Sequence, residues 1–149
     1  MNSLALQKPD LLSTRAFIGG SWCAAASGKT LAVQNPATGA VVGTIPDCDG
    51  TDTRGAIEAA QAAFEKWRGT TAGDRAALLE RWHALIRANE ADLARIMTAE
   101  QGKPLAEATG EIRYAATFVK WFAEEARRVD GKTIESPEAN RRILVLMQP

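Results

Sequence analysis

Residues whose types could do chemistry are few in this sequence, and their spacing matches no common catalytic or metal site. Cys23 and Cys48 form no Cys-x-x-Cys pair, and His83 is the only histidine. A zinc site or a disulfide framework needs such residues in clusters. We therefore interpret both cysteines as small structural thiols. The sequence also lacks a Gly-rich phosphate loop and a Gly-x-Ser-x-Gly nucleophile motif.

Three charged residues could act as acids, bases or nucleophiles by type alone. Glu124 and Glu125 are neighbours, and adjacent residues of a helix point about 100 degrees apart, so their carboxylates cannot share a proton. Lys103 lies between Gly102 and Pro104, in a predicted turn where a lysine is ordinarily a solvated cation. We interpret all three charges as solvated.

An aromatic stripe on a long predicted helix has two interpretations. Tyr114, Phe118 and Trp121 recur at i, i+4 and i+7 and share one face of that helix. This face either packs against another helix or a subunit neighbour, or forms the wall of a ligand tunnel. A different face is predicted to be core, from apolar residues at three-then-four spacing: Leu105, Ala108, Ile112, Ala115, Val119, Phe122 and Ala126.

Short antiparallel strands are predicted to precede the helices. Gly19 and Gly20 lie between the β-prone segments 15–18 and 21–22 and supply the positive φ that a tight hairpin turn needs. The segment 35–39, Asn-Pro-Ala-Thr-Gly, is dense in turn formers and separates two more β-prone runs. The predicted strands are residues 15–18, 21–22, 31–34 and 41–45.

Four helices are predicted from residue 51 onward, where Ala, Leu, Glu and Arg dominate and the apolar period lengthens. Their predicted boundaries are a cap at Thr51 or Asp52, a capping box at Thr71-x-x-Asp74, a break at Asn89, a left-handed C-cap at Gly102 and a start at Pro104. The residues predicted to be buried are Ile57, Ala60, Phe64 and Trp67 in the first helix, Leu78, Trp82, Leu85 and Ile86 in the second, and Leu93, Ile96 and Met97 in the third.

A β-strand is predicted at the C-terminal end, over residues 141–149, after a polar stretch that follows Gly131. An autonomous domain rarely ends on a continuous apolar strand, so we expect that the chain derives from a longer protein. The predicted fold class is α+β: short N-terminal antiparallel strands, about four helices including one long helix, and a C-terminal strand.

Composition sets limits on the class of protein. The chain has 149 residues and 16.0 kDa, with 46% apolar and 24% charged residues, which is typical of one globular domain. Eighteen basic residues balance eighteen acidic ones, so we expect no nucleic-acid partner and no membrane partner. Residues 1–15 are too polar for a secretory signal, and a cytoplasmic location is expected.

Three strings carry a resemblance to a known family. Residues 17–22 (Phe-Ile-Gly-Gly-Ser-Trp), 35–39 and 100–105 (Glu-Gln-Gly-Lys-Pro-Leu) resemble, in order and spacing, N-terminal landmarks of the aldehyde dehydrogenase superfamily. Residues 100–112 and the string Trp-Phe-Ala-Glu-Glu at 121–125 resemble the succinate-semialdehyde dehydrogenase branch of that superfamily. The resemblance runs from about residue 15 to the end of the chain.

This resemblance implies that the chain is roughly the first third of the aldehyde dehydrogenase fold. Residues 1–14 would be a flexible N-terminus, 15–131 the N-terminal part of the cofactor-binding domain, and 132–149 the start of the oligomerisation strand region. Family members attack the aldehyde with a thiolate, transfer a hydride to NAD(P) and hydrolyse a thioester. The family's catalytic and cofactor-binding motifs match no residue of this chain, so we predict that the 149 residues alone are inactive.

Two sets of site residues follow from the resemblance. Tyr114 resembles a position that lines the substrate tunnel, with Gly110 one turn earlier and Phe118 as a further candidate. Glu100, together with the backbone around Val33 and Gln34, resembles part of a monovalent-cation site. For Glu100 the alternative is a capping or solvated carboxylate.

The function implied is the NADP- or NAD-dependent oxidation of succinate semialdehyde to succinate, as in 4-aminobutyrate degradation, by a homo-oligomer that is a dimer or a tetramer. Glutarate semialdehyde is an alternative substrate. A rival hypothesis of another class is a non-catalytic structural or subunit-binding module that keeps this part of the fold.

Overall fold

The first hairpin forms where the paired glycines predict it. The computed structural model describes residues 4–148, in which β1 (Ala16–Ile18) pairs antiparallel with β2 (Ser21–Cys23). Gly19 and Gly20 have φ angles of 59° and 83°, the left-handed values that this two-residue turn requires. The predicted hairpin is therefore confirmed.

A second hairpin follows. β3 (Thr30–Gln34) pairs antiparallel with β4 (Val41–Pro46), and the register shifts at a bulge between Val33 and Gln34. Both strands were predicted to within a residue at each end. The Asn-Pro-Ala-Thr-Gly turn closes the hairpin, because the Asn35 carbonyl accepts the Gly39 amide at 2.7 Å.

Helix α1 (Gly50–Trp67) begins two or three residues earlier than the predicted cap implies. Asp49 is its N-cap: the Asp49 carboxylate accepts the Thr51 amide at 2.6 Å, and the Asp49 amide donates to Asp52 at 3.0 Å. The predicted cap at Thr51 or Asp52 is wrong, since the two aspartates form a reciprocal capping box around the first turn. The predicted apolar face is also not buried in this chain, where Ile57 is 62% exposed.

Three further helices form a layer of their own: α2 (Ala72–Ala88), α3 (Glu90–Gln101) and α4 (Leu105–Glu125). Their boundaries were predicted well because they are set by local capping. Thr71 accepts the Asp74 amide at 3.1 Å. Asn89 is the C-cap position of α2 and the N-cap position of α3, and its side chain donates to the Leu85 carbonyl oxygen of α2. Gly102 ends α3 with a φ of 77°, and Pro104 precedes α4.

The core lies where these three helices meet. Ala94, Ala108 and Ile112 are buried there, and Ile86, Leu93 and Met97 pack against them. Elsewhere the seam between α2 and α4 is lined by alanines with no exposed surface: Ala76, Ala116 and Ala123. Small residues on facing ridges let two helices approach closely.

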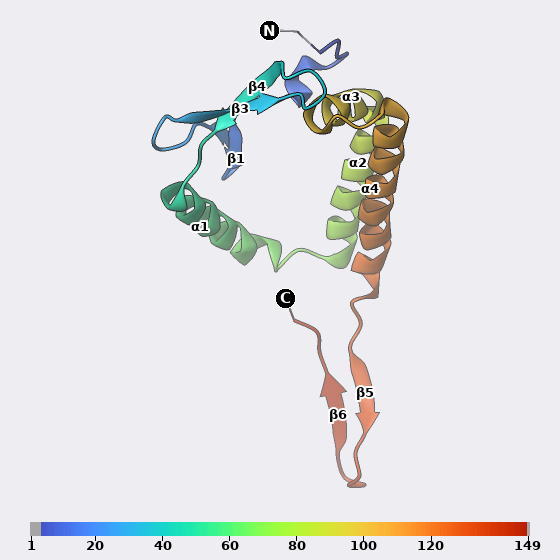
Figure 1. Cartoon of the computed structure of the whole chain (residues 1–149). Coiled ribbons are helices and arrows are strands. Elements are labelled where there is room, and N and C mark those ends of the chain that lie inside the picture. Colours follow the sequence, from blue (N-terminus) through green and yellow to red (C-terminus); the bar gives the residue numbers. More distant parts are fainter. Residues whose placement is uncertain (1–3, 149) are drawn as a thin grey trace.

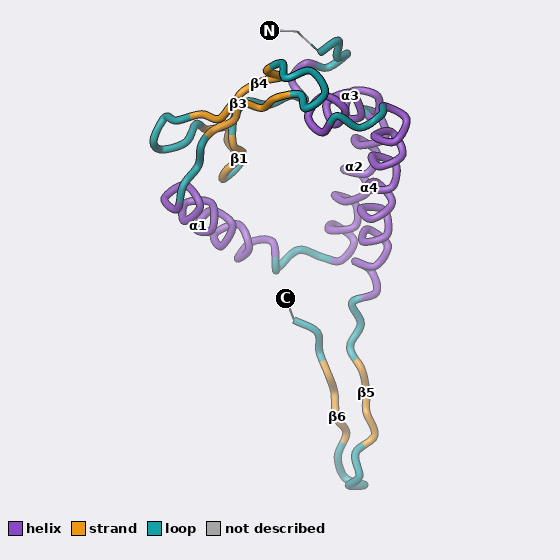
Figure 2. Tube along the Cα trace, viewed as in Figure 1, coloured by secondary structure: helices purple, strands orange, loops and turns teal. Residues whose placement is uncertain are grey.

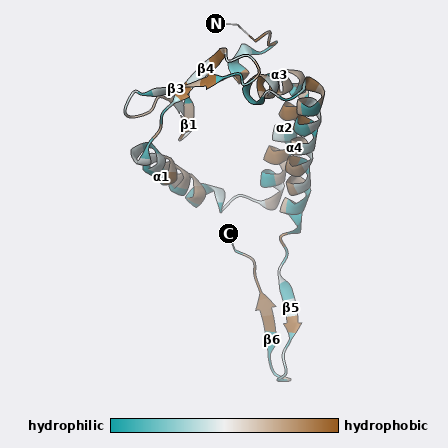
Figure 3. Cartoon of the chain, viewed as in Figure 1, coloured by the Kyte–Doolittle hydropathy of each residue, from teal (hydrophilic) through white to brown (hydrophobic). Residues whose placement is uncertain are grey.

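The predicted buried faces of α2 and α4 are therefore partly wrong. Leu78, Trp82 and Leu85 of α2 are exposed, as are Leu105, Ala115 and Phe122 of α4. The apolar period correctly places Leu78, Trp82 and Leu85 on one face of α2, but the face of α2 that packs carries Ala76, His83 and Ile86. The packed face of α4 carries Ala108, Ile112, Ala116 and Ala123. Leu78, Trp82, Leu85, Leu105 and Phe122 lie on surfaces that the described residues 4–148 leave exposed. Apolar residues recur along both helices (Figure 3).

The chain continues from α4 through the short helix η2 (Ala126–Arg128) into a second type of element, an arm. β5 (Lys132–Glu135) pairs antiparallel with β6 (Arg142–Val145), with Ile134 opposite Ile143. The predicted C-terminal strand thus ends at Val145, and Pro149 lies outside the described residues. β5 was missed because it holds a single large apolar residue.

The elements enclose an open ring from which the arm projects (Figure 1). α1 and the first two hairpins form one side, α2 and α4 form the other, and the loop after α1, drawn in teal in Figure 2, joins them. No helix among residues 4–148 is both long and apolar enough to cross a membrane. Residues 1–3 of the predicted flexible segment lie outside the described residues, and the flexibility of the rest stays a prediction.

Candidate functional site

One face of α4 carries the aromatic residues that the sequence singled out. Tyr114 is 65% exposed and Phe118 49% exposed, four residues apart on the same face. Their ring centroids lie 4.9 Å apart with an interplanar angle of 81°. This edge-to-face arrangement is a favourable one for aromatic pairs. Trp121 extends the exposed stripe by one turn.

Gly110 lies one turn before Tyr114 in the same helix. A Cβ built at Gly110 would meet no heavy atom within 4 Å outside the neighbouring helix backbone. Glycine inside a helix costs roughly 0.5–1 kcal/mol relative to alanine. Packing within this chain does not require a glycine there, and the open space continues the exposed aromatic face.

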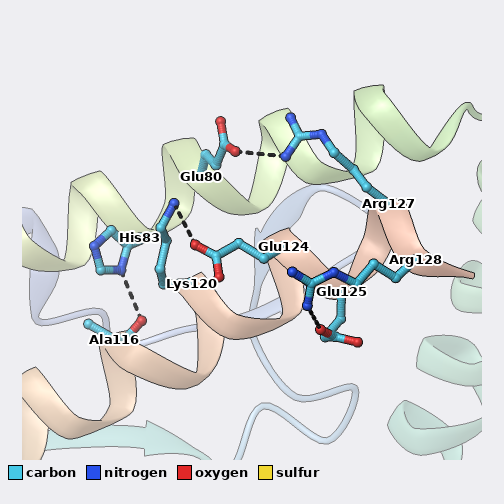
Figure 4. A network of polar contacts seen from close by, with 8 residues as sticks. All are labelled: Glu80, His83, Ala116, Lys120, Glu124, Glu125, Arg127 and Arg128. Carbon is cyan, nitrogen blue, oxygen red and sulfur yellow. Dashed lines mark hydrogen bonds and ion pairs between the residues drawn. The ribbon is translucent and has the colours of Figure 1, made fainter.

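The position of α4 is fixed from one side by polar contacts with α2 (Figure 4). The ring Nδ1 of His83 donates to the carbonyl oxygen of Ala116 at 2.9 Å, because that oxygen can only accept. Arg127, just beyond α4, pairs with Glu80 of α2 at 3.0 Å. These contacts leave the aromatic face of α4 free.

The adjacent carboxylates near the end of α4 do not act together. Glu124 pairs with Lys120 at 3.2 Å, and Glu125 pairs with Arg128. The two side chains point in different directions, as predicted for neighbours on a helix (Figure 4), but each is paired with a basic side chain, which the interpretation as solvated charges did not include.

A second set of charges joins α3 to α4. Glu90 accepts hydrogen bonds from the Arg113 Nε at 2.9 Å and from the Arg87 Nη1 at 2.6 Å. The Arg113 hydrogen bond holds the pKa of Glu90 below its ordinary value, and the same bond raises the pKa of Arg113. Arg113 directly precedes Tyr114, so this ion pair joins α3 to the helix that carries the aromatic face. The sequence reasoning missed it.

Lys103 is not the solvated cation that was predicted. The Lys103 side chain is only 21% exposed, and its ammonium group pairs with Glu111 on the second turn of α4. The correction follows from the tight turn between α3 and α4, which folds Lys103 back over that helix. Lys103 is therefore a structural contact at the start of α4.

Glu100 and Val33, two of the three predicted cation-site residues, line the same small crevice. Residues 12–14 and 42–45 form the rest of its walls. Gln34 is exposed and does not line it. Residues 4–148 contain no group of three or more His, Cys, Asp or Glu side chains that could hold a metal ion.

The two cysteines differ in their surroundings. Cys23 is half-buried, with its Sγ 3.5 Å from the Ala16 carbonyl oxygen, and Cys48 is exposed. Desolvation, together with the carboxylates of Asp52 and its neighbours, raises the pKa of the Cys48 thiol. A raised pKa disfavours the thiolate that covalent catalysis needs.

Asp92 was missed by the sequence reasoning. Its side chain is buried, and it accepts hydrogen bonds from the backbone amides of Gln7 and Lys8 and from the Arg95 side chain. Desolvation raises the pKa of Asp92, but these hydrogen bonds outweigh it and bring the pKa below its ordinary value. No local signal marks an aspartate whose partners lie so far away in the sequence.

The described residues do not fit a dinucleotide cofactor. Binding of its pyrophosphate typically uses a Gly-rich turn between a parallel strand and a helix. The strands of residues 4–148 are all paired in antiparallel hairpins, and their positive-φ glycines lie in turns and a helix end. We assign no cofactor contact to this chain.

Comparisons with known proteins connect this arrangement to an enzyme family. The sequence model described as "Aldehyde dehydrogenase family" matches residues 22–149. Among curated proteins, the glutarate-semialdehyde dehydrogenase of Pseudomonas putida is 51% identical over 146 residues, which cover 98% of this chain and 30% of that protein. The human mitochondrial succinate-semialdehyde dehydrogenase is 52% identical over 139 residues, 93% of this chain and 26% of that protein.

Solved structures give the same result. The succinate-semialdehyde dehydrogenase of Burkholderia pseudomallei is 55% identical with a TM-score of 0.91, covering 94% of this chain and 29% of that one. The chain thus spans about 30% of the length of the relatives that it matches, at their N-terminal end.

Proposed function

This chain belongs to the aldehyde dehydrogenase family, and from that premise we propose that it is part of an NAD(P)-dependent enzyme that oxidises succinate semialdehyde to succinate. The family and the α+β fold predicted from the sequence are confirmed. The substrate is the step beyond them, because the chain spans less than a third of its relatives.

The observation that carries the substrate proposal is that sequence identity to this chain depends on the substrate for which a relative is named. Relatives named for succinate or glutarate semialdehyde, or for 3-sulfolactaldehyde, are 46–55% identical to this chain. Those named for indole-3-acetaldehyde or betaine aldehyde are 30% identical. The names of the first group share a short aldehyde with an anionic group. Succinate semialdehyde is our first choice and glutarate semialdehyde the second.

The cofactor proposal also rests on the names of the relatives. One relative, from Escherichia coli, is named for NADP(+), and solved structures of the family are named as complexes with NAP or with NAD+. We propose NADP as the preferred cofactor and NAD as the alternative. Oxidation of an aldehyde in this family needs a thiolate, a base and the nicotinamide ring, and we assign none of these roles to residues 4–148.

What this chain supplies, we propose, is a wall of the substrate tunnel. An exposed ring pair at Tyr114 and Phe118 offers apolar surface to a short carbon chain, and the missing Cβ of Gly110 leaves room beside it. The alternative, in which another element packs on this face, predicts a loss of stability rather than of selectivity when Tyr114 is truncated.

Two further roles are proposed for the remaining predicted residues. Glu100 and the backbone around Val33 and Gln34 would take part in a monovalent-cation site, and the crevice shared by Glu100 and Val33 supports this. The β5–β6 arm, part of the proposed oligomerisation region 132–149, exposes Ile134, Ile143 and Leu144. It would contribute to contacts in a homodimer or homotetramer.

The tunnel proposal is tested by Tyr114→Ala in the full-length enzyme, with Tyr114→Phe as the matched control. We expect kcat/KM for succinate semialdehyde to fall by about 10- to 200-fold, as for a lost group in an apolar pocket, and longer aldehydes to lose less. Tyr114→Phe keeps the ring and should keep the substrate ratio. An unchanged ratio in Tyr114→Ala, together with a large fall in Tm, would assign Tyr114 to packing instead.

A further inference from the structure

Residues 4–14 form a segment that we call the clasp, and one buried side chain holds it. Asp92, in the first turn of α3, is 3% exposed. Its Oδ1 accepts the Gln7 amide at 3.1 Å, and its Oδ2 accepts the Lys8 amide at 2.8 Å. Arg95 donates to Oδ1 at 3.1 Å. Both carboxylate oxygens are therefore occupied by protein donors.

These hydrogen bonds account for a buried charge that would otherwise be costly. An ionised carboxylate removed from water needs charged or hydrogen-bonding partners. Two of the three donors of Asp92 are backbone amides of the clasp, 84 and 85 residues away in the sequence. The clasp is thus the main partner of Asp92, and Asp92 is its anchor on α3.

Beyond the anchor, the clasp lies between α3 and the β3–β4 hairpin at two places. Leu4 and Ala5 line a crevice whose other walls come from the hairpin and from Ala99 of α3. Residues 12–14 line the crevice that Val33 shares with Glu100. The N-terminal segment runs beside β4 and α3 where the two sides of the ring meet (Figure 1).

Between its anchor and the second crevice, the clasp is stiffened by a single 3-10 turn. Leu11 donates to the Lys8 carbonyl oxygen at 3.1 Å, and Leu12 donates to that of Pro9 at 3.0 Å. Because this turn begins at Lys8, which is bonded to Asp92, it restricts where residues 12–14 can lie relative to α3.

We propose that Asp92 is a positioning residue: it anchors the clasp, and the clasp holds the β3–β4 hairpin against α3, which fixes the backbone at Val33 relative to Glu100. Whether Asp92 anchors the clasp does not depend on the reaction. That Val33 and Glu100 then have a functional role together rests on the proposed cation site. A test that does not measure activity therefore distinguishes failure of the anchor from failure of the proposed function.

Hydrogen exchange followed by mass spectrometry of the full-length gene product tests the anchor. Asp92→Asn keeps the side-chain shape but removes the charge and one acceptor. We expect amides of residues 4–14 and 30–46 to exchange about tenfold faster or more, as when a net hydrogen bond is lost locally. Peptides from α2 and α4 should keep their rates. Glu124→Gln, which removes an exposed carboxylate from α4, is the control and should change neither segment.

Unchanged exchange of residues 4–14 in Asp92→Asn would overturn the proposal, and so would an equal acceleration in α2 and α4. Deletion of residues 1–8 is a second variant, which keeps Asp92 but removes both amide donors. We expect the deletion to accelerate exchange of residues 30–46, and adding Asp92→Asn to it to have little further effect on them. Wild-type exchange of 30–46 in the deletion variant would overturn the proposal even if Asp92→Asn does not fold.

Discussion

Gly102 and Gly110 are eight residues apart, and their surroundings differ: the structure requires a glycine at position 102 but not at position 110. Gly102 has a φ of 77°, and a Cβ there would lie 2.8 Å from the Pro36 Cγ. The turn of the β3–β4 hairpin therefore contacts the end of α3 so closely that a side chain has no room. Gly110 lies inside α4 with open space around its Cβ position.

The two positions predict stability changes of opposite sign. Gly102→Ala should destabilise the protein by about 1–3 kcal/mol, because alanine is strained at positive φ and clashes with Pro36. Gly110→Ala should stabilise it by roughly 0.5–1 kcal/mol through helix propensity. Urea unfolding of both variants measures this. A stabilising Gly102→Ala, or a strongly destabilising Gly110→Ala, would contradict the assigned environments.

At the scale of the element, the start of α1 should make stability depend on pH. Hydrogen bonds from the Asp49 amide and the Ala26 amide lower the pKa of Asp52. A carboxyl with a lowered pKa in the folded state stabilises above its unfolded pKa, about 4, and loses that contribution as the pH falls through the folded pKa.

Asp52→Asn should therefore lower the Tm by several degrees at neutral pH, and the difference from wild type should shrink below about pH 4. Thermal unfolding at several pH values measures this. Glu58→Gln removes a carboxylate of the same helix outside the first turn and is the control. A Tm difference that stays constant down to strongly acidic pH would show that the Asp52 charge is not the cause.

Most elements and many of their ends could be predicted here because the signals are local, although the N-cap of α1 and strand β5 were not. Gly19-Gly20, Thr71 and Gly102 each determine a turn or a helix end through their own backbone or side chain. The packed faces could not be predicted in the same way. Periodicity placed Leu78 and Trp82 together, yet the face of α2 that packs carries Ala76, His83 and Ile86.

Contacts between distant segments were the least accessible to sequence reasoning. Nothing near Asp92 in the sequence indicates that its partners are the amides of Gln7 and Lys8, because backbone donors carry no sequence signal. The exposed aromatic face could be predicted, since Tyr114, Phe118 and Trp121 lie at helical spacing, whereas Gly110 was added only by the family resemblance. Their role came from the family resemblance and stays a prediction.

At the scale of the whole molecule, the exposed apolar surface predicts association. Large apolar side chains are exposed on α1, on α2 and α4, and along the arm, and the net charge is zero. Contiguous apolar surface and unpaired strand edges favour self-association. We expect the isolated 149-residue chain to form species heavier than 16.0 kDa as its concentration rises. Light scattering measures this, and a 16.0 kDa monomer at every concentration would contradict it.

The most direct test of the proposed function is the substrate preference of the full-length gene product. NADPH or NADH formation would be followed with succinate semialdehyde, with glutarate semialdehyde, and with an uncharged aldehyde of the same length as the first, with the 149-residue chain as the inactive control. We predict a kcat/KM for succinate semialdehyde roughly 100-fold or more above that for the uncharged aldehyde, because a site built for a charged group rejects its neutral analogue. A folded protein that forms no reduced cofactor from either semialdehyde, or that oxidises the charged and uncharged aldehydes equally well, would contradict it.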